Sequence, residues 1–481
     1  MFISYNKGVL MNIYSIARKT KDRNFDGQFY FGVKTTGIFC RPSCPCPLAK
    51  EENVLYFHSV NEAIDQGFRP CKRCQPDVFV EHYQSNLAGT QLVKDALQLI
   101  HEGYLINHSL EALSEKLHVS QRHLRSLFIE NIGTTPVKIS MFKKAMIAKQ
   151  NLFESEDTVT KVSIQSGFGS LRQLNTVYRR VIGVTPTASR ENKDKYALGK
   201  LELHLPYDEY FDFLEVLEFL PHRITRGVEV IRDKTYSRTY RLKASSGYLL
   251  VSDEIGYLKI SLFTEDLRDV FEIYQRMMGL FDLKTDFVPI LKRFKEDPLL
   301  SKGLLGGRIP RLPKAFNPFE LTIRAVINQQ ISIKATSTFM ERLVKKSAIK
   351  TPVCFPEGLE YFFPNSLELN QTLLDDIGLT RTRQSTIKNV TEALLNKEVS
   401  LSINQSFESF QKSFIKVKGI GNWTINYVAL RGLGMVDSFP AKDLGVIKAL
   451  KTKNEKELNL IAEKWRPYRG YATLCLWHLE E

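Results

Sequence analysis

The spacing of apolar residues changes along this chain of 481 residues and separates segments of different structure. From residue 201 to about residue 283, apolar and polar residues alternate in short runs such as 201–205 and 247–251, which is the period of a half-buried strand. Helices are expected among these strands near 209–219 and 264–278. Beyond residue 285 the apolar residues recur at helical spacing instead. The C-terminal half therefore predicts a mixed α and β segment followed by an all-helical one.

An internal repeat of about 50 residues lies within segment 86–196. Each copy is typical of an amphipathic helix, a short turn and a second helix that starts at Ser120 or Ser170, because serine accepts hydrogen bonds from the free N–H groups of a helix start. Apolar residues at this spacing indicate a core first of all, whereas basic and amide residues at the start of both second helices favour DNA binding. The first copy has Leu124, Leu127, Phe128, Ile132, Gly133 and Pro136, which recur in type as Leu174, Val177, Tyr178, Ile182, Gly183 and Pro186.

The ends of the two copies, Gly-Thr-Thr-Pro and Gly-Val-Thr-Pro, together with their spacing, resemble the AraC/XylS type of double helix-turn-helix domain. Second helices of such units enter the major groove. The resemblance therefore implies that six side chains lie near bases or phosphates: Gln121, Arg122, Arg125, Arg172, Gln173 and Asn175.

Four cysteines near the start form two closely spaced pairs, Cys40 with Cys44 and Cys71 with Cys74, separated by a gap of 26 residues. Four thiolates converge when each pair lies on one turn, and such a set suits one tetrahedral Zn²⁺ ion. A purely structural zinc site is the simplest interpretation of this spacing. A further thiol, Cys46, is expected to be a bystander.

The residues around these cysteines, 35–44 and 67–76, resemble the N-terminal domain of the Ada family. The resemblance implies that Cys40 takes a methyl group permanently from a methylphosphotriester in DNA, and zinc coordination keeps such a sulfur a thiolate at neutral pH. Arg69, Lys72 and Arg73 are expected to contact neighbouring phosphates, with solvated surface charge as the alternative.

Two glycines stand between amphipathic helices in segment 414–424. Gly419 and Gly421 would let the backbone approach a phosphate closely, and the next helix would present free N–H groups to it. Lys418, between these helices, is a further expected phosphate contact.

This hairpin, joined to the segments 429–432 and 465–472, resembles AlkA-type 3-methyladenine DNA glycosylases of the helix-hairpin-helix superfamily. The resemblance implies a pocket of Trp423, Tyr427 and Trp477 for a flipped base, and a carboxylate, Asp443, that stabilises the positive sugar when the base leaves. Trp423 stands where lyase-type relatives have a lysine, which favours simple hydrolysis. Lys442 is expected to favour the ionised form of Asp443.

Segment 328–332 matches the part of such enzymes that fills the gap left by the flipped nucleotide, which implies DNA contacts for Gln329 and Gln330. Each of these residues also has a plain alternative. Asp443 would be a helix N-cap, and Trp423, Tyr427 and Trp477 would pack in a core. Their joint occurrence at the family's spacing favours the glycosylase pocket.

Composition adds the kind of partner. A formal charge of +14 and a pI near 9.2 predict an anionic partner, double-stranded DNA first of all. Stretches of 18 or more apolar residues and a signal-peptide core are both missing, so no membrane partner and a cytoplasmic protein are expected. The single C-terminal cysteine, Cys475, cannot build an iron–sulfur cluster, and neither Cys354 nor Cys475 lies in the centre of an O6-alkylguanine transferase.

The sequence thus predicts a multidomain α+β protein that repairs alkylated DNA in two ways and activates transcription from promoter DNA, with RNA polymerase as a further partner and a monomeric state. One rival hypothesis is a regulator whose zinc and glycosylase domains only bind DNA, and a second is a glycosylase whose front half is a tether. The expected domains are a zinc methyl-acceptor domain at 1–82, a double helix-turn-helix domain at 86–196, an α/β subdomain at 200–284 and a helix-hairpin-helix glycosylase domain at 285–481.

Overall fold

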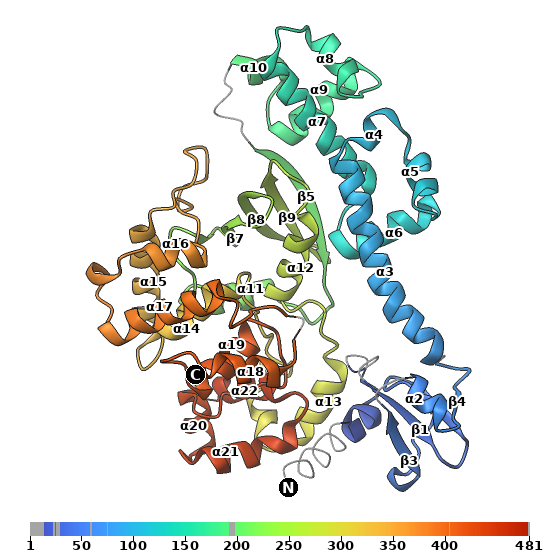
Figure 1. Ribbon diagram of the computed structural model, residues 1–481, viewed down its shortest axis with the longest axis vertical. Coiled ribbons are helices and arrows are strands. Elements are labelled where there is room, and N and C mark those ends of the chain that lie inside the picture. The colour runs from blue at the N-terminus through green and yellow to red at the C-terminus, as the bar shows by residue number, and fades with distance from the viewer. Residues whose placement is uncertain are drawn as a thin grey trace. The chain divides into compact units, whose positions relative to one another are not determined.

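A computed structural model describes residues 14–22, 25, 29–57, 60–74, 76–191, 198–403 and 405–479 (Figure 1). The chain divides into two compact units, each built from separate stretches of sequence. The first unit contains residues 1–90, 284–312 and 435–481, and the second contains 91–283 and 313–434. Each unit is described by itself. No helix in the described part of the chain combines the length and the apolar character that crossing a bilayer requires.

The N-terminal part of the first unit contains a small four-stranded sheet with the order β3-β1-β2-β4. The strand β1 pairs antiparallel with both β2 and β3, whereas β2 and β4 are parallel. Gly37, with φ 62°, makes the tight turn that joins β1 to β2. The strands are β1 (Tyr30–Val33), β2 (Ile38–Cys40), β3 (Val54–Phe57) and β4 (Arg69–Pro70), with the 3-10 helix Glu51–Asn53 and the helix α2 (Val60–Asp65) between them.

The other parts of the first unit are helical. Trp465 is fully buried there, and its Nε1 donates to Asp297 Oδ2 at 2.9 Å, which ties the two stretches 284–312 and 435–481 together. The helices are α13 (Val288–Glu296), α20 (Leu444–Leu450), α21 (Glu455–Ala462) and α22 (Arg469–His478), with 3-10 turns at Leu300–Gly303 and Glu463–Trp465.

The second unit begins with helices, and the expected repeat is plain in their order. The long helix α3 (Pro76–His101) spans the expected boundary at residues 82–86. Ser120 and Ser170 each accept a hydrogen bond from a backbone N–H in the first turn of their helix, so both predicted N-caps are confirmed. The helices that follow α3 are α4 (Tyr104–Asn107), α5 (Leu110–Lys116), α6 (Gln121–Ile132), α7 (Pro136–Glu154), α8 (Val159–Gln165), α9 (Leu171–Ile182) and α10 (Pro186–Glu191).

A five-stranded antiparallel sheet with the order β5-β9-β8-β7-β6 follows in the second unit. Leu201, Leu203 and Leu205 alternate inward along β5, as their spacing predicts. The strands are β5 (Gly199–Pro206), β6 (Glu229–Arg232), β7 (Thr235–Arg241), β8 (Ser246–Glu254) and β9 (Tyr257–Thr264).

Both helices expected within this sheet region start later than the sequence suggests. The first, α11 (Phe213–Phe219), begins only after Asp212, whose carboxylate accepts from the N–H groups of Leu214 and Glu215. The second, α12 (Val270–Leu280), begins after a turn because residues up to Thr264 still pair in β9. The first residues of each expected helix therefore lie in a turn or a strand instead.

The remaining part of the second unit is helical and contains the predicted hairpin between α18 and α19. Helix α14 is almost wholly buried along its length. The helices are α14 (Pro318–Ile327), α15 (Ile333–Ser347), α16 (Ser366–Gln371), α17 (Arg381–Leu395), α18 (Phe407–Phe414) and α19 (Asn422–Arg431), with a 3-10 turn at Asp375–Ile377.

Candidate metal, DNA and base-excision sites

The parallel pairing of β2 with β4 brings the two cysteine pairs together. Phe39 lies beside Pro70, and the Cys71 N–H donates to the Phe39 carbonyl at 3.0 Å, so Cys40 and Cys71 leave their strands side by side. A turn in which the Cys44 N–H donates to the Arg41 carbonyl at 3.1 Å returns Cys44 toward Cys40. As a result, one sulfur from each of the four predicted ligands lies within 4.8 Å of the others.

This cluster fits a zinc ion. Zinc–sulfur bonds of about 2.3 Å place tetrahedral sulfurs roughly 3.8 Å apart, a spacing that lies within the observed range. Cys40, Cys44 and Cys74 are buried, and Cys71 is half-buried. Cys46 packs against the same cluster as a half-buried fifth thiol.

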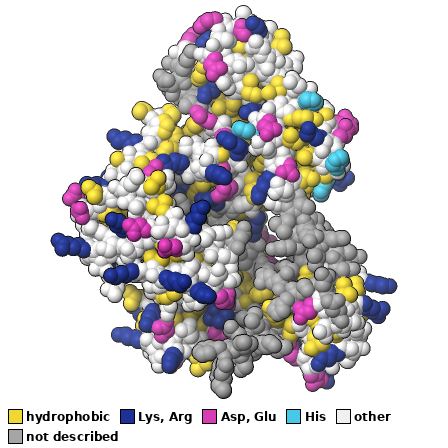
Figure 2. All heavy atoms as spheres, viewed as in Figure 1, with side chains coloured by type: hydrophobic (Ala, Val, Ile, Leu, Met, Phe, Trp, Pro, Cys, Tyr) yellow, Lys and Arg dark blue, Asp and Glu magenta, His cyan; other side chains and the backbone are white. Residues whose placement is uncertain are grey.

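The predicted phosphate contacts near the cluster are all on the surface. Arg69, Lys72 and Arg73 are exposed. Arg69 lies two residues before Cys71, and Lys72 and Arg73 lie between Cys71 and Cys74. On the face drawn in Figure 2, basic and acidic side chains are interspersed, so the net positive charge does not gather into one patch there.

The two predicted DNA-reading helices expose the side chains expected to meet DNA. Gln121, Arg122 and Arg125 on α6, and Arg172 on α9, are exposed. Gln173 and Asn175 are only partly exposed because both make local hydrogen bonds: Gln173 Oε1 accepts from the Gly169 N–H at 2.9 Å, and Asn175 Nδ2 donates to the Leu171 carbonyl at 3.0 Å.

The sequence interpretation missed part of α9. A hollow on its surface is lined by Asn175, Thr176, Arg179 and Arg180. Both arginines are exposed, and they follow the three residues named from the sequence by one to two helical turns. The adjacent arginines in the last turn were a signal that would have identified them.

The hairpin between α18 and α19 shows why one of its glycines is required. Gly419 has φ 98°, and a Cβ atom there would stand 2.1 Å from Thr386 Oγ1. Gly421 caps α19 without a side-chain hydrogen bond, and a Cβ there would meet open space. Gly419 is thus needed by the fold, whereas Gly421 leaves room for a ligand beside the free N–H groups of α19. Lys418 is exposed next to them.

The turn at 328–332 is fastened to this hairpin. Gln329 Nε2 donates to the Gly419 carbonyl at 3.2 Å and to Thr424 Oγ1 at 3.1 Å, and the Gln329 carbonyl accepts from Arg383. Gln330 is exposed at the tip with φ 58°, a left-handed conformation that is uncommon for a residue with a side chain. Arg383 and Thr386 come from α17, some 50 residues away along the chain, so no local pattern announced them.

Two of the predicted pocket aromatics meet one turn apart on α19. The rings of Trp423 and Tyr427 are stacked, with centroids 5.1 Å apart and an interplanar angle of 16°, and both are half-buried. The buried guanidinium of Arg431 lies 6.0 Å from the Tyr427 ring centroid. Burial lowers the pKa of Arg431.

The predicted carboxylate and the third aromatic meet in the first unit. Trp477 Nε1 on α22 donates to Asp443 Oδ1 at 2.9 Å, and the same oxygen accepts from the Gly445 N–H at 3.0 Å as the N-cap of α20. Asp443 therefore caps a helix, as the plain alternative expected, and it also accepts a hydrogen bond from Trp477, one of the aromatics predicted for the pocket. Lys442 ion-pairs with Glu455 at 2.8 Å, so its ammonium has another carboxylate as its partner. Trp423 and Tyr427 belong to the second unit.

Comparison with known proteins identifies the same succession of domains along the chain: zinc-binding, helix-turn-helix and glycosylase. Three family models match the chain: the metal binding domain of Ada over residues 14–77, a helix-turn-helix domain over 113–192 and the AlkA N-terminal domain over 202–317. The fold of 57% of the chain is shared with 96% of a 3-methyladenine DNA glycosylase from Archaeoglobus fulgidus, at a TM-score of 0.50 and 19% identity. These matches confirm the predicted zinc domain, helix-turn-helix domain and glycosylase fold.

Relatives in sequence show that these domains occur together in one protein. The chain is 26% identical over 280 residues to DNA-3-methyladenine glycosylase 2 of Escherichia coli, which covers 56% of this chain and 94% of that protein. Over 474 residues it is 31% identical to the "Probable bifunctional transcriptional activator/DNA repair enzyme AlkA" of Mycobacterium tuberculosis, which covers 96% of this chain and 95% of that protein. The chain therefore belongs to the family of bifunctional transcriptional activators and DNA repair enzymes that this mycobacterial protein represents, with a four-cysteine zinc site at its N-terminal end.

Proposed function

We propose that the protein takes methyl groups from methylphosphotriesters in DNA, activates transcription once it is methylated, and excises alkylated purines of the 3-methyladenine type. The observation that carries this proposal is the similarity to a bifunctional activator and repair enzyme along nearly the whole chain. The expected division at 1–82, 86–196, 200–284 and 285–481 is part of the proposal, as are a monomeric state and a cytoplasmic location.

In the proposed methyl transfer, the Cys40 thiolate attacks the methyl carbon of the phosphotriester. A sulfur–carbon bond forms, the carbon–oxygen bond breaks, and the electron pair stays on the phosphate oxygen, which leaves an ordinary phosphodiester. Zinc, when bound by the four cysteines, keeps the sulfur an ionised thiolate at neutral pH. Exposed Arg69, Lys72 and Arg73 would hold the phosphates on either side.

The transfer also changes the charge of the site. Four thiolates on Zn²⁺ carry a net charge of −2, and conversion of one thiolate to a neutral thioether leaves −1. Weaker repulsion from the DNA backbone would raise the affinity for DNA. The exposed residues of α6 and α9 would then read promoter DNA, and RNA polymerase would be the partner that responds.

Base excision would use the C-terminal half. Free N–H groups at the start of α19, with Gly421 and Lys418, would hold a phosphate, and Gln330 would fill the gap left by the flipped nucleotide. Trp423 and Tyr427, stacked on α19, would hold the base by stacking, and the sequence resemblance adds Trp477 to this role. Asp443 would stabilise the positive charge that develops on the sugar, and water would complete the hydrolysis.

The methyl transfer is tested by intact mass after incubation with duplex that contains methylphosphotriesters. We expect a gain of one methyl group, which peptide mapping places on Cys40. Cys40→Ser should abolish the gain, and Cys46→Ser is the matched control that should retain it. Cys475 is an internal negative, since burial raises the pKa of its thiol to about 12. No gain in the unaltered protein, or a methyl group on the half-buried Cys71 instead, would refute the assignment.

Base excision is tested by release of methylated purines from alkylated duplex. Release by the unaltered protein, together with DNA binding that rises after methylation, supports the full proposal. DNA binding without any release of base would leave the regulator-only hypothesis. Release of base without a mass gain would leave a glycosylase whose front half is a tether.

A further inference from the structure

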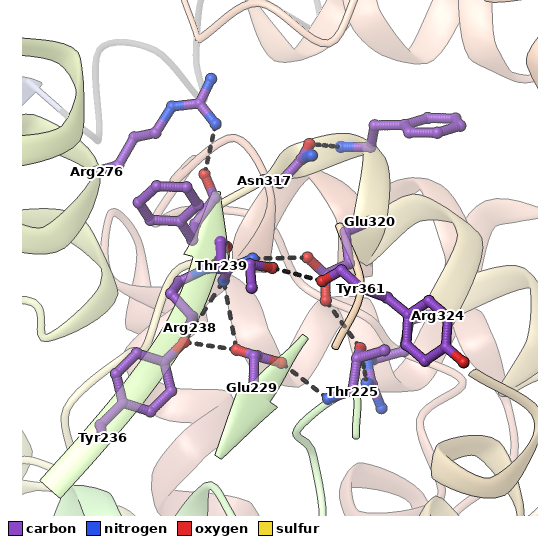
Figure 3. Close-up of polar contacts among 12 residues, drawn as sticks. Thr225, Glu229, Tyr236, Arg238, Thr239, Arg276, Asn317, Glu320, Arg324 and Tyr361 are labelled. Carbon is purple, nitrogen blue, oxygen red and sulfur yellow. Dashed lines mark hydrogen bonds and ion pairs between the residues drawn. The ribbon is translucent and has the colours of Figure 1, made fainter. Parts of the chain in front are cut away.

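A buried polar network joins the five-stranded sheet to helix α14 within the second unit (Figure 3). Arg238 on β7 donates to Glu229 Oε1 at 3.3 Å and to Glu320 Oε2 on α14 at 2.9 Å, and Tyr236 donates to Glu229 at 2.5 Å. Arg238 is 3% exposed. Buried charges are costly unless each has partners, so this network fixes α14 against the sheet.

Thr225 is the residue that extends the network beyond the ion pairs. Its N–H donates to Glu229 Oε2 at 2.8 Å, its hydroxyl donates to Glu320 Oε1 at 2.8 Å, and the same hydroxyl accepts from Arg324 Nη2 at 2.8 Å. The side chain is fully buried. The hydroxyl therefore connects a carboxylate near the start of α14 with a guanidinium near its end, as the close-up shows (Figure 3).

Arg324 leads from this network to the turn at 328–332. Its carbonyl accepts from the Asn328 N–H at 2.8 Å, where α14 ends, and its Nη1 donates to Ser337 Oγ on α15 at 3.4 Å. Thr336, beside Ser337, donates to Asn328 Oδ1 at 2.7 Å. These bonds join α14 and α15, the two helices that flank the turn, to each other.

The turn carries a residue in an unfavourable backbone conformation. Gln330, at φ 58°, keeps this conformation only while its surroundings determine it. Gln329 fastens one side of the turn to the hairpin through Gly419 and Thr424. On the other side, Asn328 accepts from Thr336, and the neighbouring Ser337 accepts from the Arg324 guanidinium, to which the Thr225 hydroxyl is also bonded.

We infer that Thr225 is a positioning residue for base flipping: its buried hydroxyl sets Arg324, which holds the turn that places Gln330 in the DNA. The inference rests on the proposed excision activity and adds a residue more than 100 positions away from the turn in sequence. The physical reason is that catalysis requires accurate placement: a shift of about 1 Å in the side chain that fills the gap in the DNA duplex costs up to roughly 100-fold in rate.

The test compares Thr225→Val, which keeps the shape and removes the hydroxyl, with Thr225→Ser, which keeps the hydroxyl. Single-turnover release is measured for a methylated purine opposite its normal partner and for the same lesion opposite a mismatched base, which is easier to flip. Each change is also made together with Gln330→Ala, and affinity for undamaged duplex is measured for all variants.

We expect Thr225→Val to slow release from the paired lesion about 10- to 100-fold and from the mismatched lesion less, with undamaged-duplex affinity within about twofold. Thr225→Ser should stay within about threefold of the unaltered protein, and Thr225→Val should add nothing to Gln330→Ala. Should Thr225→Val fail to fold, Ser337→Ala removes the contact of Arg324 with α15 and carries the same expectations.

Equal losses on the paired and mismatched lesions, or full additivity with Gln330→Ala, would overturn the inference, because a general loss of structure would act on both substrates. So would release by Thr225→Val within twofold of the unaltered rate. An unaltered protein that releases no base at all would instead contradict the proposed excision activity.

Discussion

Asp443 caps a helix and, in the proposed excision, also stabilises a positive sugar, and two substitutions separate these roles. The carboxylate caps α20 through the Gly445 N–H and accepts from Trp477 Nε1, which are structural duties that any nearby acceptor oxygen can fulfil. Stabilising a sugar cation instead requires the negative charge. Asparagine keeps an acceptor oxygen and removes the charge, whereas alanine removes both.

The two contacts of Asp443 set the expected loss of stability in each variant. Loss of an N-cap costs about 1 kcal/mol, and leaving the half-buried Trp477 N–H without this acceptor costs about 1 kcal/mol more. Asp443→Ala should therefore lose about 2 kcal/mol, equivalent to a melting temperature roughly 4–8 °C lower in a unit of this size. Asp443→Asn should lose about 0.5 kcal/mol or less, because asparagine is as good an N-cap as aspartate.

Activity should follow a different order. Both variants should release methylated purines about 100- to 1000-fold more slowly than the unaltered protein, because neither carries the charge. Release is measured under single-turnover conditions at 25 °C, where both variants are folded, and stability by thermal unfolding of the same samples. If Asp443→Asn retained at least a third of the unaltered rate, the carboxylate would be only a helix cap, and the catalytic reasoning would fail.

Three further predictions concern other parts of the chain. Gly419→Ala should lower the melting temperature and the affinity for duplex together, because its Cβ would stand 2.1 Å from Thr386 Oγ1. Gly421→Ala faces open space and should lower the melting temperature less, only by the cost of a poorer N-cap. Equal destabilisation by the two changes would contradict this difference. Removal of zinc with a chelator should abolish methyl acceptance and make the N-terminal part sensitive to protease, while base release persists. Loss of both activities would contradict this prediction, because it would show that both parts depend on the metal. Burial would raise the pKa of Asp297, but hydrogen bonds from Trp465 and nearby backbone N–H groups hold that pKa below its usual value. The carboxylate therefore contributes stability above about pH 4 that is lost as the pH falls further. Asp297→Asn should flatten the decline in unfolding free energy below about pH 4, and an unchanged slope would contradict this.

Features fixed by short stretches of sequence were predictable. The cysteine spacing places each thiol pair on one turn, and the serines at 120 and 170 stand next to the helices that they cap, so local chemistry determines both. The alternation along β5 likewise reports one buried face of a sheet. These patterns depend on neighbours within a few positions, which the sequence displays directly.

Contacts between distant positions were not predictable in the same way. Thr386 lies beneath Gly419, and Thr225 bonds Glu320 across 95 positions, although neither threonine differs in its local setting from many others. The pairing of Lys442 with Glu455 was likewise not foreseen. The expected helix starts at 209 and 264 were wrong. The cap at Asp212 makes the first helix begin at Phe213, and strand pairing up to Thr264 makes the second begin at Val270.

The gain in DNA affinity that the proposed methylation can supply is limited, and most of the preference for a specific site must therefore come from another part of the protein. Removing one charge from the metal site changes its interaction with a phosphate by about 1 kcal/mol at 4 Å in water, and by less at the Debye length of about 8 Å in physiological salt. One or two phosphates near Arg69 and Arg73 therefore bring roughly a tenfold gain in affinity, far below the typical thousandfold or greater difference between specific and non-specific sites. In the proposal, the sequence-specific remainder would come from exposed residues of α6 and α9. Methylation would then change how tightly the protein stays bound, whereas the helix-turn-helix pair would decide on which promoter.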